Sequence, residues 1–328
     1  VLEFEGNRHE FEKPMRIISE YDVPEDAWFF QQNSHPEWMP YSVLMEIALQ
    51  PCGFISANSG AMLIYPELDL HYRNLDGNGT LSKHIDLRGK TIQAEVELYS
   101  TVASGNTVIQ KHRFLLKCEG LPFYKGDTVF GYFTDEALEN QTGLDGGKAK
   151  LPWLDENTSH DMKVYRLNDS NSRLESGKPH LKLAGNQLNL LDEVHLSPSV
   201  GSHGKGYAYG KRIVDPKDWF FPCHFHQDPV MPGSLGVEAI LQALQVFCLD
   251  QKLGDSFSNP RFRPSLSKTR WKYRGQIIPT TGMMQLELHV SKIEKRDEQL
   301  MLVADASLWR DELRIYEVQD ISLVIEEA

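Results

Sequence analysis

A degenerate internal repeat constrains the fold of this chain more than any other feature. One copy reads WFFQQNSHPEWMPYSVLMEIALQ (residues 28–50) and the other WFFPCHFHQDPVMPGSLGVEAILQ (residues 219–242). Aligned on Trp-Phe-Phe and Met-Pro, with one residue fewer in the first copy, they pair Glu46 with Glu238 and Gln50 with Gln242. The leads into the copies also agree, VPEDAW against VDPKDW. The repeat predicts two copies of one domain.

Each copy ends in an apolar run that predicts a helix. The second opens at Met231-Pro232-Gly233-Ser234, where proline costs no hydrogen bond and serine can cap, and it runs to about Leu249. Beyond Val237 its polar side chains are Glu238, Gln242 and Gln245, which share one helix face. Such a helix is mostly buried, so Glu238 lies in a narrow solvent-facing stripe, in a hydrogen-bonded polar stripe, or in a functional site.

Downstream of each helix, apolar and polar residues alternate, first in Thr91–Leu98 and again in Met284–Val290. This period predicts half-buried antiparallel strands. Further strand-like runs lie at Thr107–Glu119, Thr128–Phe133, Leu300–Trp309 and Arg314–Ile325. One long helix followed by several strands in each half favours an α+β fold, in which an antiparallel sheet wraps around a central helix, over a βαβ series.

The two copies differ where chemistry would occur. The second copy has His224 among aromatic residues, and the first has Gln32 at that position. A histidine in such surroundings is either a hydrogen-bonded core residue or a base. Gly233 at a helix start can offer its N–H and the positive end of the helix dipole to an oxyanion, whereas the first copy has Tyr41 there. With an acid, these groups could remove a proton next to a thioester carbonyl and expel a β-hydroxyl.

The run CHFHQDPVMPGSLGVEAILQ resembles the signature of the β-hydroxyacyl-ACP dehydratases with the hotdog fold, especially the β-hydroxydecanoyl type. The similarity includes the histidine, the DPVMPG turn, the acid fourteen residues after the histidine and a glutamine four residues beyond that acid. It is strong in Gly204–Gln245 and weaker over nearly all of the remaining chain. A degenerate hotdog followed by an intact one looks most like the dehydratase regions of microbial polyunsaturated fatty acid synthases.

The resemblance implies a role for each residue of the site. His224 would be the catalytic base, the Val230 carbonyl would orient its ring, and the Gly233 N–H would bind the thioester oxygen. Because each site in this family takes its histidine from one hotdog and its acid from the other, His224 would work with Glu46 and Gln50. The chain would then remove water from a (3R)-hydroxyacyl thioester, with a protonated Glu46 donating to the departing hydroxyl and a tunnel along the two helices holding the acyl chain.

The mirror site would hold Glu238 and Gln242 opposite Gln32, and is expected to be inactive. No metal or cofactor is expected, since the substrate would be carried on the phosphopantetheine of an acyl carrier protein. His224-Phe-His226 with Asp228 could be read as a metal cluster, but the usual zinc spacings are absent. His35, eleven residues before the helix acid of its copy, is predicted to be a surface or core residue.

The expected domains are a degenerate hotdog at residues 1–134, a linker at 135–185, and a hotdog with the dehydratase signature at 186–328. The linker is rich in polar residues and glycine, with apolar islands at Leu151–Leu154 and Val164–Leu167. About fifty residues can cross the width of a domain, so we expect a belt laid over one face. The two hotdogs are expected to form a double hotdog, and a homodimer of double hotdogs is left open.

Composition limits the partners of the chain. Lys and Arg total 34 against 46 Asp and Glu, giving a net charge of −12, which argues against general nucleic-acid binding and against attraction to anionic membranes. No apolar run approaches the length of about 18 residues that spans a bilayer, and no signal peptide is recognisable. The four cysteines form no C-x-x-C pair, which favours reduced thiols in a cytoplasmic protein.

A basic segment, RFRPSLSKTRWKYR at Arg261–Arg274, contains six Lys or Arg and no acid. It can be a solvated strand edge protected by charge. It can also be a landing patch for an acidic carrier protein and its pantetheine phosphate, formed by Arg261, Arg263, Lys268 and Arg270.

Two other functions stay open beside dehydration. A hotdog acyl thioesterase would use an acid to activate water and needs no histidine in this context. A non-catalytic scaffold that binds the acyl carrier protein would need neither the acid nor the histidine. In either case the expected partners are a carrier-protein domain and other domains of a multidomain synthase, and the sequence does not decide whether a trans-2 product is isomerised to cis-3.

Overall fold

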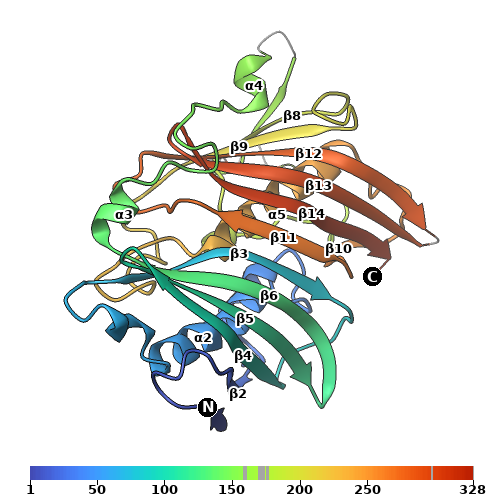
Figure 1. The fold of residues 1–328 in the computed structure, drawn as a ribbon. Coiled ribbons are helices and arrows are strands. Elements are labelled where there is room, and N and C mark those ends of the chain that lie inside the picture. Colours follow the sequence, from blue (N-terminus) through green and yellow to red (C-terminus); the bar gives the residue numbers. More distant parts are fainter. Residues whose placement is uncertain (158–160, 169–173, 175–176, 297, 328) are drawn as a thin grey trace. The chain divides into compact units, whose positions relative to one another are not determined.

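Two units, each built around one long helix, make up the chain (Figure 1). The structure is a computed structural model that describes residues 1–157, 161–168, 174, 177–296 and 298–327. The first unit comprises Val1–Ala27, Ser42–Gln141 and Leu266–Tyr273, and the second comprises Trp28–Tyr41, Thr142–Ser265 and Arg274–Ala328.

These units depart from the expected boundaries in two short segments. Residues 28–41 of the first repeat copy belong to the second unit, where the Trp28 ring lies 5.2 Å from the Trp219 ring and Arg261 donates to Glu37 at 3.0 Å. Conversely, Leu266–Tyr273 belongs to the first unit. Each half of the sequence therefore supplies a segment to the other unit, an exchange that a linear repeat cannot reveal.

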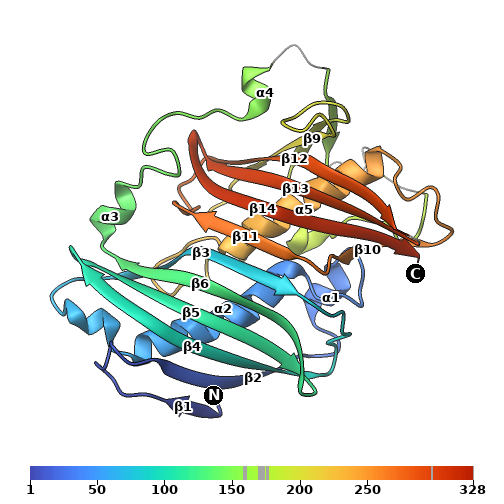
Figure 2. The ribbon, with the colours of Figure 1, turned by 45° about the vertical axis from the view of Figure 1, so that its right-hand side comes forward.

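The first unit is an antiparallel sheet with helix α2 (Tyr41–Asn58) along it (Figure 2). In chain order its strands are β1 (Glu3–Glu5), β2 (Met15–Asp22), β3 (His71–Leu81), β4 (Thr91–Ser104), β5 (Thr107–Cys118), β6 (Leu121–Phe133) and β11 (Lys268–Tyr273). They lie in the order β1-β2-β4-β5-β6-β3-β11. The turn η1 (Ala61–Ile64) and the short helix α3 (Asp135–Glu139) complete this unit.

The second unit repeats this plan around helix α5 (Gly233–Asp250). Its strands are β7 (Lys163–Arg166), β8 (Glu193–Ser197), β9 (Tyr207–Ile213), β10 (Pro260–Pro264), β12 (Met283–Arg296), β13 (Gln299–Arg310) and β14 (Leu313–Glu327). They lie in the order β7-β8-β9-β12-β13-β14-β10. The short helices α1 (Trp28–Gln32) and α4 (Trp153–Glu156) and the turn η3 (Asn186–Leu188) also belong to it.

The two sheets share one topology, so the repeat extends beyond the matching segments. Strands β1, β2 and β4–β6 of the first unit correspond to β8, β9 and β12–β14 of the second. The alternation predicted for Thr91–Leu98 is confirmed, because the apolar residues of this part of β4 are buried and their neighbours are not. In β12 the same alternation is broken at Glu287, which is buried because it accepts from the Trp153 N–H at 2.7 Å. Both units thus have the predicted hotdog arrangement of an antiparallel sheet and a central helix.

The two central helices have different surroundings. Every residue of α5 from Ser234 to Asp250 is buried, including the polar stripe, so that stripe faces protein and not solvent. In α2, by contrast, Gln50 and Phe54 are exposed. The segment Tyr41–Ile64 is long and apolar enough to cross a membrane by length and composition, a test that the core helix of a soluble protein also passes. In this structure α2 packs on its sheet as a core helix does.

The linker packs along the second unit in several places. Asp145 pairs with Arg314 through two hydrogen bonds of 2.7 and 2.8 Å. The apolar islands expected in the linker coincide with α4 and β7, and β7 pairs with β8. At Lys163 the amino group lies 2.9 Å from Asp250. The belt stays a prediction, and parts of it (158–160, 169–173 and 175–176) lie outside the described residues.

Candidate active site

The loop between β9 and α5 fixes the position of His224. The His224 N–H donates to the Phe220 carbonyl at 3.0 Å, and the Val230 N–H donates to the His224 carbonyl at 2.7 Å. Phe220 is fully buried, so these backbone bonds tie the loop to the core. The Met231 N–H, bound to the Ile277 carbonyl at 2.9 Å, anchors the end of the loop. The half-buried imidazole is thereby held on a rigid support.

The protonation of the His224 ring follows from its partner. Nδ1 lies 2.8 Å from the Val230 carbonyl oxygen, which is the orienting contact that the family resemblance implied. A carbonyl can only accept, so Nδ1 must carry the hydrogen. In the neutral ring Nε2 then has an available lone pair. This tautomer can accept a proton at Nε2, although the catalytic role of His224 stays a prediction.

Helix α5 begins at Gly233 without a side-chain cap. Its N-cap residue is Pro232, whose carbonyl accepts from the Leu235 N–H at 3.0 Å. The expected cap by Ser234 is therefore wrong, because this residue lies inside the first turn. First-turn N–H groups of a helix have no partner within the helix, and the helix dipole is positive there. The Gly233 amide lies at this positive end, and its role as the oxyanion donor stays a prediction.

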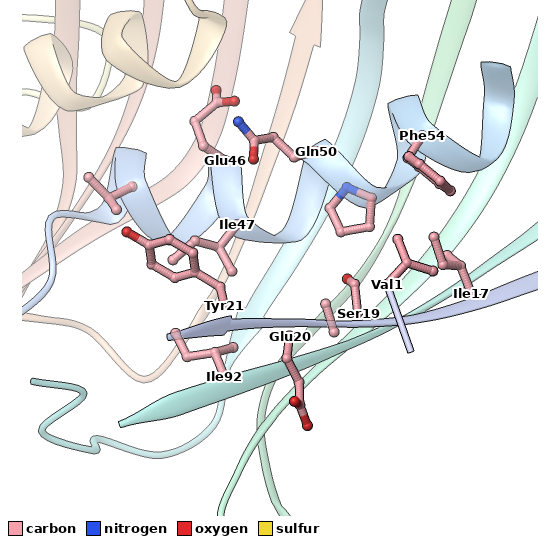
Figure 3. A pocket seen from close by; sticks show the side chains of 13 residues that line it. Val1, Ile17, Ser19, Glu20, Tyr21, Glu46, Ile47, Gln50, Phe54 and Ile92 are labelled. Carbon is pink, nitrogen blue, oxygen red and sulfur yellow. The ribbon is translucent and has the colours of Figure 1, made fainter. Parts of the chain in front are cut away.

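Glu46 and Gln50 lie in the first unit, on α2. They help to line a pocket of about 530 Å³ between α2 and strands β2 and β4. Figure 3 shows their side chains extending from the same side of the helix toward one another. Glu46 is half-buried, and Gln50 is exposed. Since His224 lies in the second unit, its pairing with Glu46 stays a prediction.

The residues of the expected mirror site all lie in the second unit, and two of them, Gln32 and Gln242, bind the segment of residues 186–192 that precedes β8. Gln32 accepts from the Gln187 N–H at 2.9 Å and donates to the Gln187 side chain at 3.2 Å. Gln242 accepts from the Leu190 N–H at 2.9 Å and donates to Asn189 at 3.1 Å. Sequence reasoning missed these partners because no motif marks Gln187 or Asn189.

Other groups at the mirror site are equally enclosed. Glu238 is 7% exposed, and Gln245 donates to the Ser34 hydroxyl at 3.5 Å. His35 is a buried core residue whose Nδ1 accepts from the Glu37 N–H at 3.3 Å. Of the two predicted positions for His35, surface or core, the structure therefore shows the core. Because the carboxamide of Gln32 cannot act as a base, no proton acceptor stands at the position equivalent to His224. The inactivity of this site stays a prediction.

The basic segment is not one exposed patch. Arg263 is 6% exposed and donates to Glu326 at 2.5 Å, and Arg261 pairs with both Glu37 and Glu326. Lys268 and Arg270 point outward from β11, whose buried and exposed residues alternate. The ion pairs therefore neutralise the part of the expected patch that lies in the second unit. The carrier-binding role stays a prediction that depends mainly on β11.

A serine–histidine pair in the first unit resembles catalytic machinery but is enclosed. Ser56 Oγ lies 3.0 Å from His112 Nε2 and 2.9 Å from the Tyr72 hydroxyl. Ser56 and His112 are both fully buried, and burial lowers the pKa of His112 to about 3. The pair is thus a neutral hydrogen-bonded network beneath α2. Among the described residues, no group of three or more His, Cys, Asp or Glu side chains could hold a metal ion.

Comparison with known proteins supports the sequence resemblance. Residues 183–319 match the model of the FabA-like domain. The chain is 37% identical over 321 residues to one of the polyunsaturated fatty acid synthase subunits of a Thraustochytrium species, an alignment that covers 94% of this chain and 21% of that protein. The chain thus spans about a fifth of the length of this curated relative.

Two solved structures show the same fold at low sequence identity. One is the dehydratase domain from the CurJ module of the curacin polyketide synthase (TM-score 0.51, 11% identity, 99% of this chain and 95% of that chain). The other is a protein assigned as an oleoyl thioesterase, from Lactobacillus plantarum (TM-score 0.52, 6% identity, 95% of this chain and 96% of that chain). Since both kinds of protein share the fold, the fold alone does not choose between dehydration and hydrolysis.

Proposed function

We propose that this chain is a hydro-lyase acting on 3-hydroxyacyl thioesters, because residues 183–319 match the model of the FabA-like domain. The product would be a 2-enoyl thioester. The similarity to a polyunsaturated fatty acid synthase supports a setting in fatty acid synthesis, in the cytoplasm and beside other synthase domains. The substrate would then arrive on the phosphopantetheine of an acyl carrier protein.

One observation carries this proposal, namely the hydrogen bond of His224 Nδ1 to the Val230 carbonyl at 2.8 Å. It leaves Nε2 of a neutral imidazole as a base. Removing the α-proton of a thioester requires such a base, and the hydrolytic alternative does not require it. The adjacent Gly233 amide, at the positive end of α5, would stabilise the negative charge that develops on the thioester oxygen.

The proposed step conserves atoms and charge. His224 Nε2 takes the (3R)-hydroxyacyl α-proton, and the electron pair of that C–H bond becomes the new double bond. The bond between the β-carbon and the hydroxyl oxygen breaks, and Glu46 in its acid form donates a proton so that water leaves. The imidazolium and the carboxylate return to their starting forms when a proton passes from one to the other. Gln50, one turn after Glu46 and beside it in Figure 3, would position the acid.

Carrier recognition and assembly form the outer part of the proposal. Lys268 and Arg270 on β11 would contact the acidic carrier protein, because their side chains alternate outward from that strand. A homodimer of double hotdogs and isomerisation of the product to the cis-3 isomer are further possibilities that the test below addresses. Both are separate from the dehydration step.

The test is incubation of the purified chain with a 3-hydroxydecanoyl or trans-2-decenoyl thioester, followed by mass and double-bond analysis. Interconversion of the two by loss or gain of water supports the proposal, and a cis-3 product adds isomerisation. Release of free acid without an enoyl product would assign a thioesterase instead. Binding of the acylated carrier with no turnover would assign a scaffold. Measuring the molar mass of the same sample in solution decides whether the chain forms a homodimer.

A further inference from the structure

The pocket of the first unit lies on the side of α2 that faces β2 and β4. Ser19 and Tyr21 border it from β2, and Gln50 and Phe54 from α2 (Figure 3). Its volume of about 530 Å³ lies within the range of roughly 300–1,000 Å³ that is usual for ligand pockets. Phe54 is 46% exposed, so a large apolar surface remains open to solvent at its edge.

The internal repeat identifies the equivalent positions in the second unit. Ser19 and Tyr21 precede Val23 by four and two residues, as Gly210 and Arg212 precede Val214. Strand pairing gives the same equivalence, because Ser19 faces Ala94 in β4 and Gly210 faces Leu286 in β12. On the helices, Gln50 corresponds to Gln242 and Phe54 to Val246.

In the second unit, the segment of residues 186–192 that precedes β8 contacts three of these positions, Gly210, Arg212 and Gln242. Gln242 accepts from the Leu190 N–H at 2.9 Å and donates to Asn189 at 3.1 Å. Arg212 donates to the Asn189 carbonyl at 3.1 Å. A Cβ placed on Gly210 would lie 3.0 Å from Leu191 Cδ1, so the glycine provides the space for that leucine.

The leucines of this segment are enclosed. Leu188, Leu190 and Leu191 are at most 1% exposed, and Val246, at the position equivalent to Phe54, is fully buried. The segment runs directly into β8, which pairs with β9 as β1 pairs with β2 in the first unit. The second unit therefore holds, against the equivalent positions of its helix and sheet, a leucine-bearing segment that continues into β8.

We propose that the pocket of the first unit is a binding site for an extended peptide segment with leucines in the positions of Leu190 and Leu191. Gln50 would bind a backbone N–H of that peptide, as Gln242 binds Leu190. The leucine side chains would cover the apolar surface between Phe54 and Ile17, which borders the same pocket. The proposed peptide site shares Gln50 with the proposed function and lies beside Glu46, so a bound peptide would compete with substrate. The tests below measure binding through Tm and hydrogen exchange and not turnover, so either proposal can fail without the other.

The test fuses the peptide to the chain in front of Val1, so that it can reach the pocket. Pairing of Glu3 with Ile18 extends to place Val1 opposite Glu20, the equivalent of Lys211, which faces Glu193. Residues Gly185–Asp192 (GNQLNLLD) fused in front of Val1 would therefore enter the pocket in the observed register. A matched control carries GNQSNSSD, with the three leucines of the fused copy replaced by serine.

The leucine fusion should raise the Tm by about 5 °C over the serine fusion, since it buries apolar surface that is otherwise in water. It should also slow amide hydrogen exchange in residues 43–54. Gln50→Ala should reduce both effects. Ser19→Gly should increase them in the leucine fusion only, because it recreates the space that Gly210 provides.

Equal Tm and equal exchange in the two fusions would overturn the proposal. If a fusion does not fold, the free eight-residue peptide is added to the unmodified chain, and slower exchange in residues 43–54 supports the proposal while unchanged exchange overturns it. A decanoyl thioester is the competing probe. If it slows exchange in this segment and the leucine peptide does not, the pocket belongs to an acyl chain and the proposal fails.

Discussion

Helices α2 and α5 correspond through the repeat, have 18 residues each and carry the same Glu-x-x-x-Gln pair, yet they occupy different environments. Around α5 both members of the pair are buried, and Gln242 is bound by the segment that precedes β8. Along α2 the same pair borders a pocket. The motif alone therefore does not determine whether a carboxylate and an amide can meet a substrate, because the segment packed against the helix decides it.

The two aromatic loops before these helices differ in a second way. Both belong to the second unit, but one holds an imidazole against the Val230 carbonyl and the other holds the Gln32 carboxamide against Gln187. A base is thus available at one copy only. If the proposed function is correct, one repeat copy supplies the base and the other supplies an accessible acid.

Replacing the base should have the largest effect. We expect His224→Ala to lower dehydration by roughly 10²–10⁴-fold, the usual contribution of a positioned acid or base. Gln32→Ala is the matched control and should leave the rate within a few fold. Turnover of a 3-hydroxyacyl thioester measures both, with circular dichroism to show that each variant is folded. A folded His224→Ala variant with normal turnover would remove this residue from the mechanism.

The second-largest effect should come from replacing one of the two helix acids, Glu46 but not Glu238. Glu46→Gln should lower turnover by roughly 10²-fold or more because it removes the proton donor, whereas Glu238→Gln should be tolerated since its carboxylate is enclosed at a site without a base. Loss of activity in Glu238→Gln with survival of Glu46→Gln would move the active site entirely into the second unit.

Stability should distinguish the enclosed helix from the open one. Leu191→Ala leaves a cavity beside Gly210 and should cost about 2–5 kcal/mol of unfolding free energy. Phe54→Ala removes a larger side chain, but one that is 46% exposed, and should cost about 1 kcal/mol or less. Urea unfolding of both variants provides the measurement. Equal costs would contradict the difference in enclosure.

Charge on β11 should have a smaller and salt-dependent effect. Lys268→Ala with Arg270→Ala should weaken the use of a carrier-linked substrate several-fold, because only the carrier presents an acidic surface. Short soluble thioesters should be used as before. The double variant Arg261→Ala with Arg263→Ala is a less suitable test of docking, since those residues are paired with Glu326. An equal loss on both substrates, or no response to salt, would exclude carrier docking at β11.

The smallest expected effect is the pH dependence contributed by β8, which anchors the enclosing segment. Lys211 and His195 bind Glu193 and lower the pKa of its carboxyl to about 2. A lowered folded-state pKa contributes stability that is present above the unfolded value of about 4.3 and is lost as pH falls toward 2. Glu193→Gln should therefore flatten the fall in Tm across this pH range. An unchanged slope would show that this ion pair does not stabilise the fold.

The sequence was sufficient for the elements that depend on local pattern. Period-two alternation located β4 and β12, and the repeat located α2 and α5. The orientation of His224 was implied by family resemblance, because the turn that brings Val230 back to the imidazole is encoded in one short motif. Enclosure of Gln242 by Asn189 was not predictable, since it depends on a contact 53 residues apart with no motif. Neutralisation of Arg263 by Glu326 was missed for the same reason.

The late position of β11 in the chain has a consequence during synthesis on the ribosome. Strand β3 pairs with β11, in the register of Lys268 with Thr80, so its outer edge has no partner until residue 273 has been made. An open strand edge is a template for pairing with other chains. A nascent chain that has completed every other strand of the first unit must therefore wait for most of the second half to emerge before that edge is closed. Slow translation between residues 133 and 268 is expected to favour aggregation over folding.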